Sequence, residues 1–356
     1  MILKTPVIAV FDIGKTNKKV FLWSTTFEIV FEKQQTFDEI VDEDGFACED
    51  LGALQQWIVS TFAELCQLPE FEIIGLNFSA YGASIVYVDR VGEPLAPLYN
   101  YLKPVSKSFP YTEYGGEDEF ARKTASPILG NLNSGLQVYE STFRSFWPEV
   151  FKAVHFPNYL ASLFTGRLVS EITSIGCHTA LWDFDLGQYH PWVATIQDQL
   201  APISTEAFLP IDGINYGLGL HDSSAALVPY LRSISDEFVL LSTGTWCIAM
   251  HPFNESPLSA EELAEDVLCY LQPNGKPVKA SRLFGGHFHE EQVARMEAHF
   301  GGSYHDLTFS KRVFSLSSRS SSVFECAFAS CDLHDFPDIA SAYDQFMVDL
   351  VGQQLH

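Results

Sequence analysis

The chain has 356 residues, enough for two domains of ordinary size, each with its own hydrophobic core. Hydrophobic residues make up 47% of the sequence and aromatic residues 14%, which is typical of a packed globular protein and excludes an intrinsically disordered one. The formal net charge of −24 argues against nucleic acid or an anionic membrane as the main partner.

The compartment is predicted from two features. Neither a secretory leader pattern nor an apolar run of membrane-spanning length is found in the sequence. The seven cysteines are scattered and include no Cys-x-x-Cys pair, so neither a disulfide framework nor a zinc site is expected. We therefore expect a cytoplasmic protein.

The first stretch with chemical character is FDIGKTNKK (11–19), whose Gly-Lys-Thr matches the end of a nucleotide-binding P-loop. A P-loop also needs a glycine five residues before Gly14, where this chain has Ala9, and a helix after the motif. Here the apolar, strand-like run VFLW (20–23) follows instead. The pattern predicts two strands, at 7–11 and 20–23, joined by a polar glycine turn.

The elements that follow can be read from hydrophobic periodicity and turn residues. A third strand is expected at 28–37, and apolar residues at helical spacing predict a helix over 50–66. Two further strands are expected at 72–79 and 83–90, on either side of Tyr81-Gly82. Residues 94–148 are rich in Pro, Tyr and Gly, which predicts an irregular cap. A helix that ends at Gly166 is expected over 156–168.

A second strand–turn–strand, FVLLS (238–242) and CIAMH (247–251) around Thr-Gly-Thr-Trp, repeats the plan of residues 7–23. The repetition predicts two related α/β domains, 1–232 and 233–356, with both turns facing a shared cleft. The alternative is that any α/β protein contains several such hairpins.

The first turn carries groups suited to phosphate. Asp12 ends a buried strand, where a carboxylate is unfavourable unless it serves a partner such as a metal ion or its waters. Gly14 allows close approach of a ligand to the backbone, and the polar side chains after it can donate hydrogen bonds to phosphate oxygens. These side chains are Lys15, Thr16, Asn17 and Lys19. The alternative is a surface hairpin with solvated lysines.

Two more stretches carry polar groups. The second turn can hold a phosphate through its N–H and O–H groups, or it is an ordinary polar hairpin; its residues are Ser242, Thr243, Gly244 and Thr245. GLGLHDSSAAL (217–227) places His221-Asp222 before small residues that can begin a helix. Asp222 suits a general base acting on a hydroxyl, while the alternative is that Asp222 or Ser223 is a helix N-cap.

In this order the three stretches resemble the FGGY carbohydrate kinases of the actin-like ATPase superfamily. DIGKTNKK (12–19) is similar to the family's first phosphate motif, with Lys15 in place of the usual threonine. LLSTGTW (240–246) resembles the second phosphate motif, and GLHDSSAAL (219–227) resembles the catalytic aspartate motif. LNFSAYGASIVYVDRVGEPLAP (76–97) resembles the sugar-side strand pair. The His-Asp pair and the Ser-Thr-Gly-Thr-Trp turn favour the rhamnulokinase and fuculokinase side of the family.

The resemblance implies two ribonuclease-H-like α/β domains around a cleft and ATP-dependent phosphorylation of a sugar or ketose hydroxyl. Asp222 would then be the catalytic base, and Asp12 would hold Mg²⁺ through water. The two turns and Lys19 would bind the phosphates of ATP. On the sugar side the resemblance implies Tyr81, Gly82, Ala83 and His221.

Two departures stand out. The family's Lys-x-x-Trp signature is not recognisable near 132–147, and neither Gly285-Gly286 nor Gly301-Gly302 continues into the Gly-Gly-x-x-x-Asn turn that holds adenosine. We therefore expect a truncated second domain, a fragment of a longer kinase, and weak ATP binding. The helix expected over 339–355 would lack strands to cover, exposing an apolar face that could form a homodimer. That face comprises Phe346, Met347, Leu350 and Val351.

Rival interpretations come from other classes of protein. One is a non-catalytic sugar-binding or regulatory protein with a kinase fold. Another is a hydrolase using Ser223 and His221, although neighbouring residues on a chain rarely point at each other. Histidines in the region 287–305 are expected to be solvated residues rather than metal ligands, and SLSSRSSSVF (315–324) a flexible loop.

Overall fold

A computed structural model describes residues 4–243, 246–307 and 325–355 of the chain. The chain divides into two compact units. The first consists of residues 1–235 with 255–258 and 269–278, and the second consists of 236–254, 259–268 and 279–356. The assignment of 1–232 and 233–356 as sugar-side and ATP-side domains stays a prediction.

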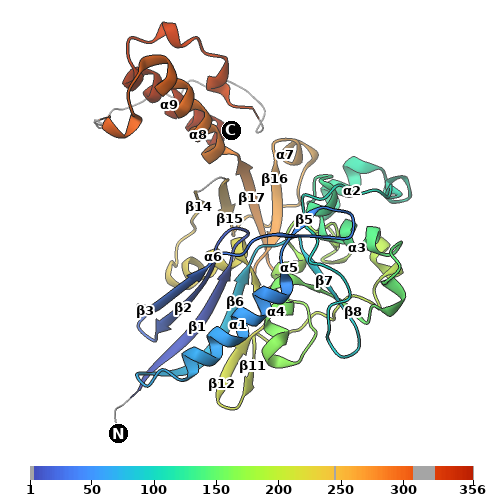
Figure 1. Cartoon of the computed structure of the whole chain (residues 1–356). Coiled ribbons are helices and arrows are strands. Elements are labelled where there is room, and N and C mark those ends of the chain that lie inside the picture. The colour runs from blue at the N-terminus through green and yellow to red at the C-terminus, as the bar shows by residue number, and fades with distance from the viewer. Residues whose placement is uncertain (1–3, 244–245, 308–324, 356) are drawn as a thin grey trace. The chain divides into compact units, whose positions relative to one another are not determined.

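The first unit is built on a seven-stranded sheet in the order β11-β12-β6-β1-β2-β3, with β13 also paired to β6 (Figure 1). Strands β1, β2 and β3 are antiparallel neighbours, whereas β6 runs parallel to β1, and β12 and β13 run parallel to β6. The strands are β1 (Thr5–Ile13), β2 (Lys18–Ser24), β3 (Ile29–Gln35), β6 (Phe71–Ala80), β11 (Phe208–Ile211), β12 (Ile214–Gly217) and β13 (Leu220–His221).

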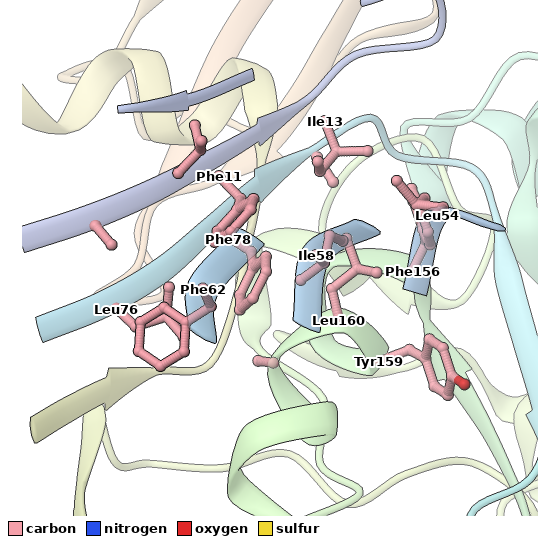
Figure 2. Close-up of a cluster of buried hydrophobic side chains, with 14 of the residues drawn as sticks. Phe11, Ile13, Leu54, Ile58, Phe62, Leu76, Phe78, Phe156, Tyr159 and Leu160 are labelled. Carbon is pink, nitrogen blue, oxygen red and sulfur yellow. The ribbon is translucent and has the colours of Figure 1, made fainter. Parts of the chain in front are cut away.

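The core of this unit lies between the sheet and two helices, α1 (Leu51–Cys66) and α4 (Phe156–Thr165). Alternate residues of β1 point inward, and the Phe11 and Phe78 rings stack with their centroids 5.4 Å apart. Figure 2 shows Phe11 and Phe78 beside Ile58 of α1 and Leu160 of α4. The sheet therefore packs against α1 and α4 through a continuous buried core.

Apart from α6, the remaining elements of the first unit are short. Strands β7 and β8 pair antiparallel, and the region 94–148 contains only two short helices and 3₁₀ turns, as the sequence predicted. These elements are β4 (Ile40–Val41), β5 (Ala47–Cys48), β7 (Ile85–Val88), α2 (Glu117–Thr124), α3 (Ser134–Ser141), β8 (Lys152–His155), α5 (Ile172–Ile175), β9 (Trp182–Asp183), β10 (Gln188–Tyr189) and α6 (Asp222–Ser233).

A second sheet has the order β14-β15-β17-β16, and the tip between β16 and β17 is counted with the first unit. Strands β14 and β15 form the second antiparallel hairpin that the sequence predicted. The elements are β14 (Leu240–Ser242), β15 (Cys247–His251), α7 (Ala260–Ala264), β16 (Val267–Leu271), β17 (Pro277–Leu283), α8 (Gly285–Phe300) and α9 (Ile339–Leu355).

The expectation that α9 exposes an apolar face is wrong for most of that face. Phe346 is fully buried, Met347 and Leu350 are partly buried, and only Val351 is exposed, at 44%. The reason is that α8 and the segment 326–336 pack against α9 and form a small core with it. This core removes the basis for predicting a homodimer through α9. The serine-rich stretch 315–324 lies outside the described residues.

None of the helices in the described ranges is long and apolar enough to cross a membrane.

Candidate active site

The first turn is a hairpin loop that places Asp12 beside Lys19. In the register of β1 and β2, Asp12 lies opposite Lys19 and Ile13 lies opposite Lys18, and the Gly14 N–H donates to the Asn17 carbonyl at 3.0 Å. Because side chains alternate along strands, Asp12 and Lys19 share one face of the sheet. The hairpin thus sets a carboxylate and an ammonium group next to the loop 14–17.

Three predicted site segments meet at one edge of the sheet. Asp12 lies opposite Ser79 in the parallel pair of β1 and β6, and His221 lies opposite Ala80 in the parallel pair of β13 and β6. Tyr81 and Asp222 follow immediately after these strands. The carboxyl ends of parallel strands are the usual place for ligands in α/β proteins, so this edge is the candidate active site.

Asp12 and Asp222 are electrostatically coupled. Burial is the main cause that raises the pKa of Asp12; the charge of Asp222 raises it further, while Lys19 opposes both effects. Burial also raises the pKa of Asp222, against a hydrogen bond of 2.6 Å from the Ser223 N–H. The side chain of Asp222 nevertheless stays 42% exposed. Asp222 is therefore a carboxylate that a substrate can reach and whose proton affinity is raised.

The donor set fits a hydrated magnesium ion. Among the described residues, no three or more His, Cys, Asp or Glu side chains gather as direct metal ligands. A cation beside Asp12 and Asp222 would relieve their mutual repulsion, and Mg²⁺ usually retains several of its waters. Asp12 therefore fits the role of holding Mg²⁺ through water.

The lysines of the turn all have carboxylate partners. The Lys15 ammonium is 2.6 Å from Glu39 and the Lys19 ammonium is 3.7 Å from Glu32, both on partly exposed surface. A phosphate would compete with these surface pairs, which are weak in water. Thr16 and Asn17 are exposed at the tip of the turn.

Of the four predicted sugar-side residues, Tyr81, Gly82, Ala83 and His221, only Gly82 presents appreciable surface. Tyr81 is buried and Ala83 is buried with a left-handed φ of 61°, whereas Gly82 is partly exposed. A Cβ atom on Gly82 would lie 2.9 Å from Cδ2 of His221, closer than packing allows. The glycine is therefore required for the close approach between this segment and the His-Asp pair.

His221 is buried beside the candidate base. It is only 3% exposed, and burial lowers its pKa to about 4, so the imidazole is neutral at pH 7. Its Nε2 lies 3.3 Å from Asp222 Oδ1, and its Nδ1 lies 3.3 Å from Ser224 Oγ. This geometry suits a residue that orients Asp222 better than one that contacts a sugar.

The contacts around α6 bear on two alternatives raised by the sequence, the helix N-cap and the hydrolase pair of Ser223 and His221. His221 occupies the N-cap position of α6, so neither Asp222 nor Ser223 is the cap. The Ser223 hydroxyl lies 3.3 Å from Asp222 Oδ1, whereas the imidazole Nδ1 of His221 faces Ser224. The pair of Ser223 and His221 that a hydrolase would need is therefore not formed.

Two asparagines that sequence reasoning missed hold the approach to β13. Asn77 Oδ1 accepts the Gly219 N–H at 3.0 Å, and Asn158 Nδ2 donates to the carbonyls of Leu218 and Gly219 at 2.8 and 3.0 Å. These bonds fix the backbone immediately before His221. No local pattern could have identified them, since they join positions far apart in the chain.

Glu171 and Thr173 form a second support that was missed. The His221 N–H donates to Thr173 Oγ1 at 3.1 Å, and the carboxyl group of Glu171 accepts hydrogen bonds from the Thr173 N–H and hydroxyl. Burial raises the pKa of Glu171 to about 7. The backbone of the His-Asp pair is thus anchored to the N-terminal end of α5.

Tyr101 is a further missed residue near the site. Burial raises its pKa, with a smaller lowering by the charge of Lys15 and a smaller rise from that of Asp222. Its ring meets that of Tyr81 edge-on with a centroid separation of 6.0 Å. Tyr101 is partly exposed beside the segment that carries Gly82.

In the second unit, the predicted second turn is described in part. Ser242 and Thr243 are exposed at the end of β14, while Gly244 and Thr245 lie outside the described residues. Trp246, which follows, stacks on Phe284 with centroids 4.5 Å apart. The hairpin is confirmed, and its role in phosphate binding stays a prediction.

Comparisons with known proteins agree with this architecture. Residues 235–313 match the family model of the carbohydrate kinase FGGY C-terminal domain. A carbohydrate kinase from Novosphingobium aromaticivorans is similar in structure, with a TM-score of 0.69, 28% identity, and coverage of 82% of this chain and 66% of that one. No curated protein matches the chain.

More distant structures share the fold. A xylulose kinase from Lactobacillus acidophilus has a TM-score of 0.68 and 17% identity, with coverage of 81% of this chain and 62% of that one. A glycerol kinase from Plasmodium falciparum, solved with ADP, has a TM-score of 0.65 and 16% identity, with coverage of 82% and 64%. The chain thus spans just under two thirds of the length of these structures.

The fold is that of the actin-like ATPase superfamily, as the sequence predicted. Residues 235–313 match the FGGY family model and the structural neighbours are carbohydrate kinases, which agrees with the resemblance to the FGGY carbohydrate kinases found in the sequence. The closer resemblance to rhamnulokinases and fuculokinases stays a prediction.

Proposed function

We propose that this chain acts in the ATP-dependent phosphorylation of a sugar or ketose hydroxyl. The observation that carries the proposal is the meeting of Asp12, Asp222 and the glycine turn 14–17 at the carboxyl ends of adjacent parallel strands. Phosphoryl transfer relies mainly on positioning and electrostatics, which such an arrangement of a base, a cation-holding carboxylate and donors supplies.

In this proposal Asp222 accepts the proton of the attacking hydroxyl. Its raised pKa makes it a stronger base than an ordinary aspartate, and its exposed side chain can reach the substrate. His221 is assigned to orienting Asp222, because the imidazole is buried and neutral. Gly82 and Tyr101 are assigned to the sugar surface, since both are partly exposed near the base.

The phosphates are assigned to the two turns. Gly14, Thr16, Asn17 and Lys19 would hold one part of the triphosphate, with Lys15 exchanging its Glu39 partner for phosphate. The second turn, 242–245, would hold another part. Mg²⁺ held by Asp12 through water would neutralise phosphate charge.

The test is a panel of ketoses, deoxyketoses and related sugars incubated with MgATP, with release of ADP and of phosphosugar as the readouts. Sugar-dependent release of both products is expected for at least one member of the panel. If a sugar binds in calorimetry and no phosphosugar forms, the alternative of a non-catalytic sugar-binding or regulatory protein replaces this proposal.

A further inference from the structure

Lys18 places an ammonium group in the interior of the first unit. It lies opposite Ile13 on the inward face of the hairpin and is only 2% exposed. Such a charge is strongly unfavourable without a partner. Its Nζ is 2.7 Å from Glu49 Oε1, a carboxylate that is 5% exposed, and it donates to the Lys15 carbonyl at 2.9 Å.

Glu49 also contacts Tyr81, in the predicted sugar-side segment 81–83. Its Oε2 accepts the Tyr81 hydroxyl at 3.2 Å. Burial and the negative charge of Glu49 raise the pKa of Tyr81 well above its usual value, so the phenol remains a donor. The Tyr81 N–H also donates to the Ile13 carbonyl at 3.2 Å.

The chain of contacts therefore runs from the candidate phosphate turn, through Lys18 and Glu49, to the residue before Gly82. All its members belong to one compact unit. The ammonium of Lys18 has three N–H donors, and the acceptor for one of them is the Lys15 carbonyl, which lies in the turn itself.

We propose that Lys18 is a positioning residue that ties the phosphate turn 14–17 to Glu49 and Tyr81, and so fixes the turn relative to the sugar-side segment. The proposal rests on the proposed function for its phosphate ligand. Loss of the tether leaves the turn free to adopt conformations that do not bind phosphate, and the apparent affinity for nucleotide falls with the competent fraction.

The experiment compares Lys18→Met, the double variant Lys18→Met/Glu49→Gln, and Lys33→Met as a control. Lys33→Met removes a surface lysine of β3, whose ammonium lies 2.7 Å from the carboxylate of Glu64 on α1. Lys18→Met alone leaves Glu49 buried without its counter-ion and is expected to destabilise the fold. The double variant removes both buried charges, keeps an acceptor for Tyr81, and lacks the link that Lys18 makes between the Lys15 carbonyl and residue 49.

Thermal stability, calorimetric affinity for MgATP and amide exchange of residues 12–18 are measured on each protein. The double variant is expected to recover the stability lost in Lys18→Met while binding MgATP about tenfold or more weakly than wild type, as expected for one lost hydrogen bond from a charged donor. Wild-type affinity in a stable double variant would overturn the proposal and leave Lys18 a simple counter-ion.

Absence of MgATP binding in the wild type would count against the proposed function. Amide exchange then decides the role of Lys18 by itself. Faster exchange at residues 12–18 in the double variant than in Lys33→Met supports the tether, and equal exchange in the two proteins overturns it.

Discussion

At the scale of single residues, the candidate site combines partly buried carboxylates, which are unfavourable in the folded protein, with neighbouring groups that partly stabilise them. Burial raises the pKa values of both Asp12 and Asp222, and the negative charge of Asp222 raises the pKa of Asp12 further. Lys19 and the Ser223 N–H offset only part of this effect. Perturbed carboxylates of this kind are common at functional sites.

Replacing Asp222 by Asn should therefore raise the melting temperature near pH 7. A carboxyl group whose pKa is raised on folding contributes stability below its unfolded value of 3.8, and that contribution is lost as the pH rises through the folded value. The advantage of the variant should accordingly shrink as the pH falls towards 4.

Melting curves between pH 4 and pH 8 check this, with the exposed Asp38→Asn as the matched control. A melting temperature that falls at pH 7 in Asp222→Asn would mean that the charged carboxylate stabilises the fold.

The contrast between Asp12 and Lys18 shows what residue patterns can reveal. Asp12, Gly14 and Asp222 could be predicted, because motif spacing places them at strand ends. Lys18 was missed, although the alternation that buries Val20 and Leu22 places it on the same inward face. The available signal was a lysine at an inward position of the strand. Its partner Glu49 could not be predicted, because the two residues meet only in the tertiary fold.

At the scale of elements, the approach to β13 depends on a glycine. Gly219 has a φ of 79°, and a Cβ there would lie 2.1 Å from the Pro157 carbonyl oxygen. The backbone at this point is also held by Asn77, 142 residues away in sequence. Contacts over such a separation leave no local pattern, which is why the support of the His-Asp pair could not be predicted.

Gly219→Ala should destabilise the protein by at least about 2 kcal/mol, the sum of left-handed strain and a backbone clash. Gly213→Ala is the matched control, because Gly213 has a φ of 86° with open space around its Cβ position. Urea unfolding measures both. Equal losses in the two variants would show that the contact with Pro157 carries no energy.

The helix α9 is the element for which the sequence-based expectation was wrong. Its apolar spacing was correctly recognised, but the partner surfaces, α8 and 326–336, were not anticipated as its cover. Phe346→Ala should destabilise the α8–α9 core by about 3–5 kcal/mol, whereas Val351→Ala, at a 44% exposed position, should change it by less than about 0.5 kcal/mol.

Hydrogen exchange within 285–300 measures the stability of that core directly in both variants. Equal exchange rates in Phe346→Ala and the wild type would contradict the packing of α9 on α8.

At the scale of the whole molecule, the sheet order and the family comparisons support a sugar kinase architecture, and the sugar is predicted to bind the first unit. A sugar found in the substrate panel should slow amide exchange at residues 79–83 and 219–224, which flank Asp222 and Gly82. Slower exchange confined to residues of the second unit, 236–254, 259–268 and 279–356, would place the sugar there and contradict the assignment.

The central claim is that Asp222 is the base of a sugar kinase. The most direct measurement is sugar-dependent release of ADP by the wild type and by Asp222→Asn, with sugar affinity measured in parallel by calorimetry. We expect turnover to fall by ~10²–10⁴, the usual effect of removing a positioned base, with sugar affinity largely kept. Near wild-type turnover in Asp222→Asn would contradict the claim.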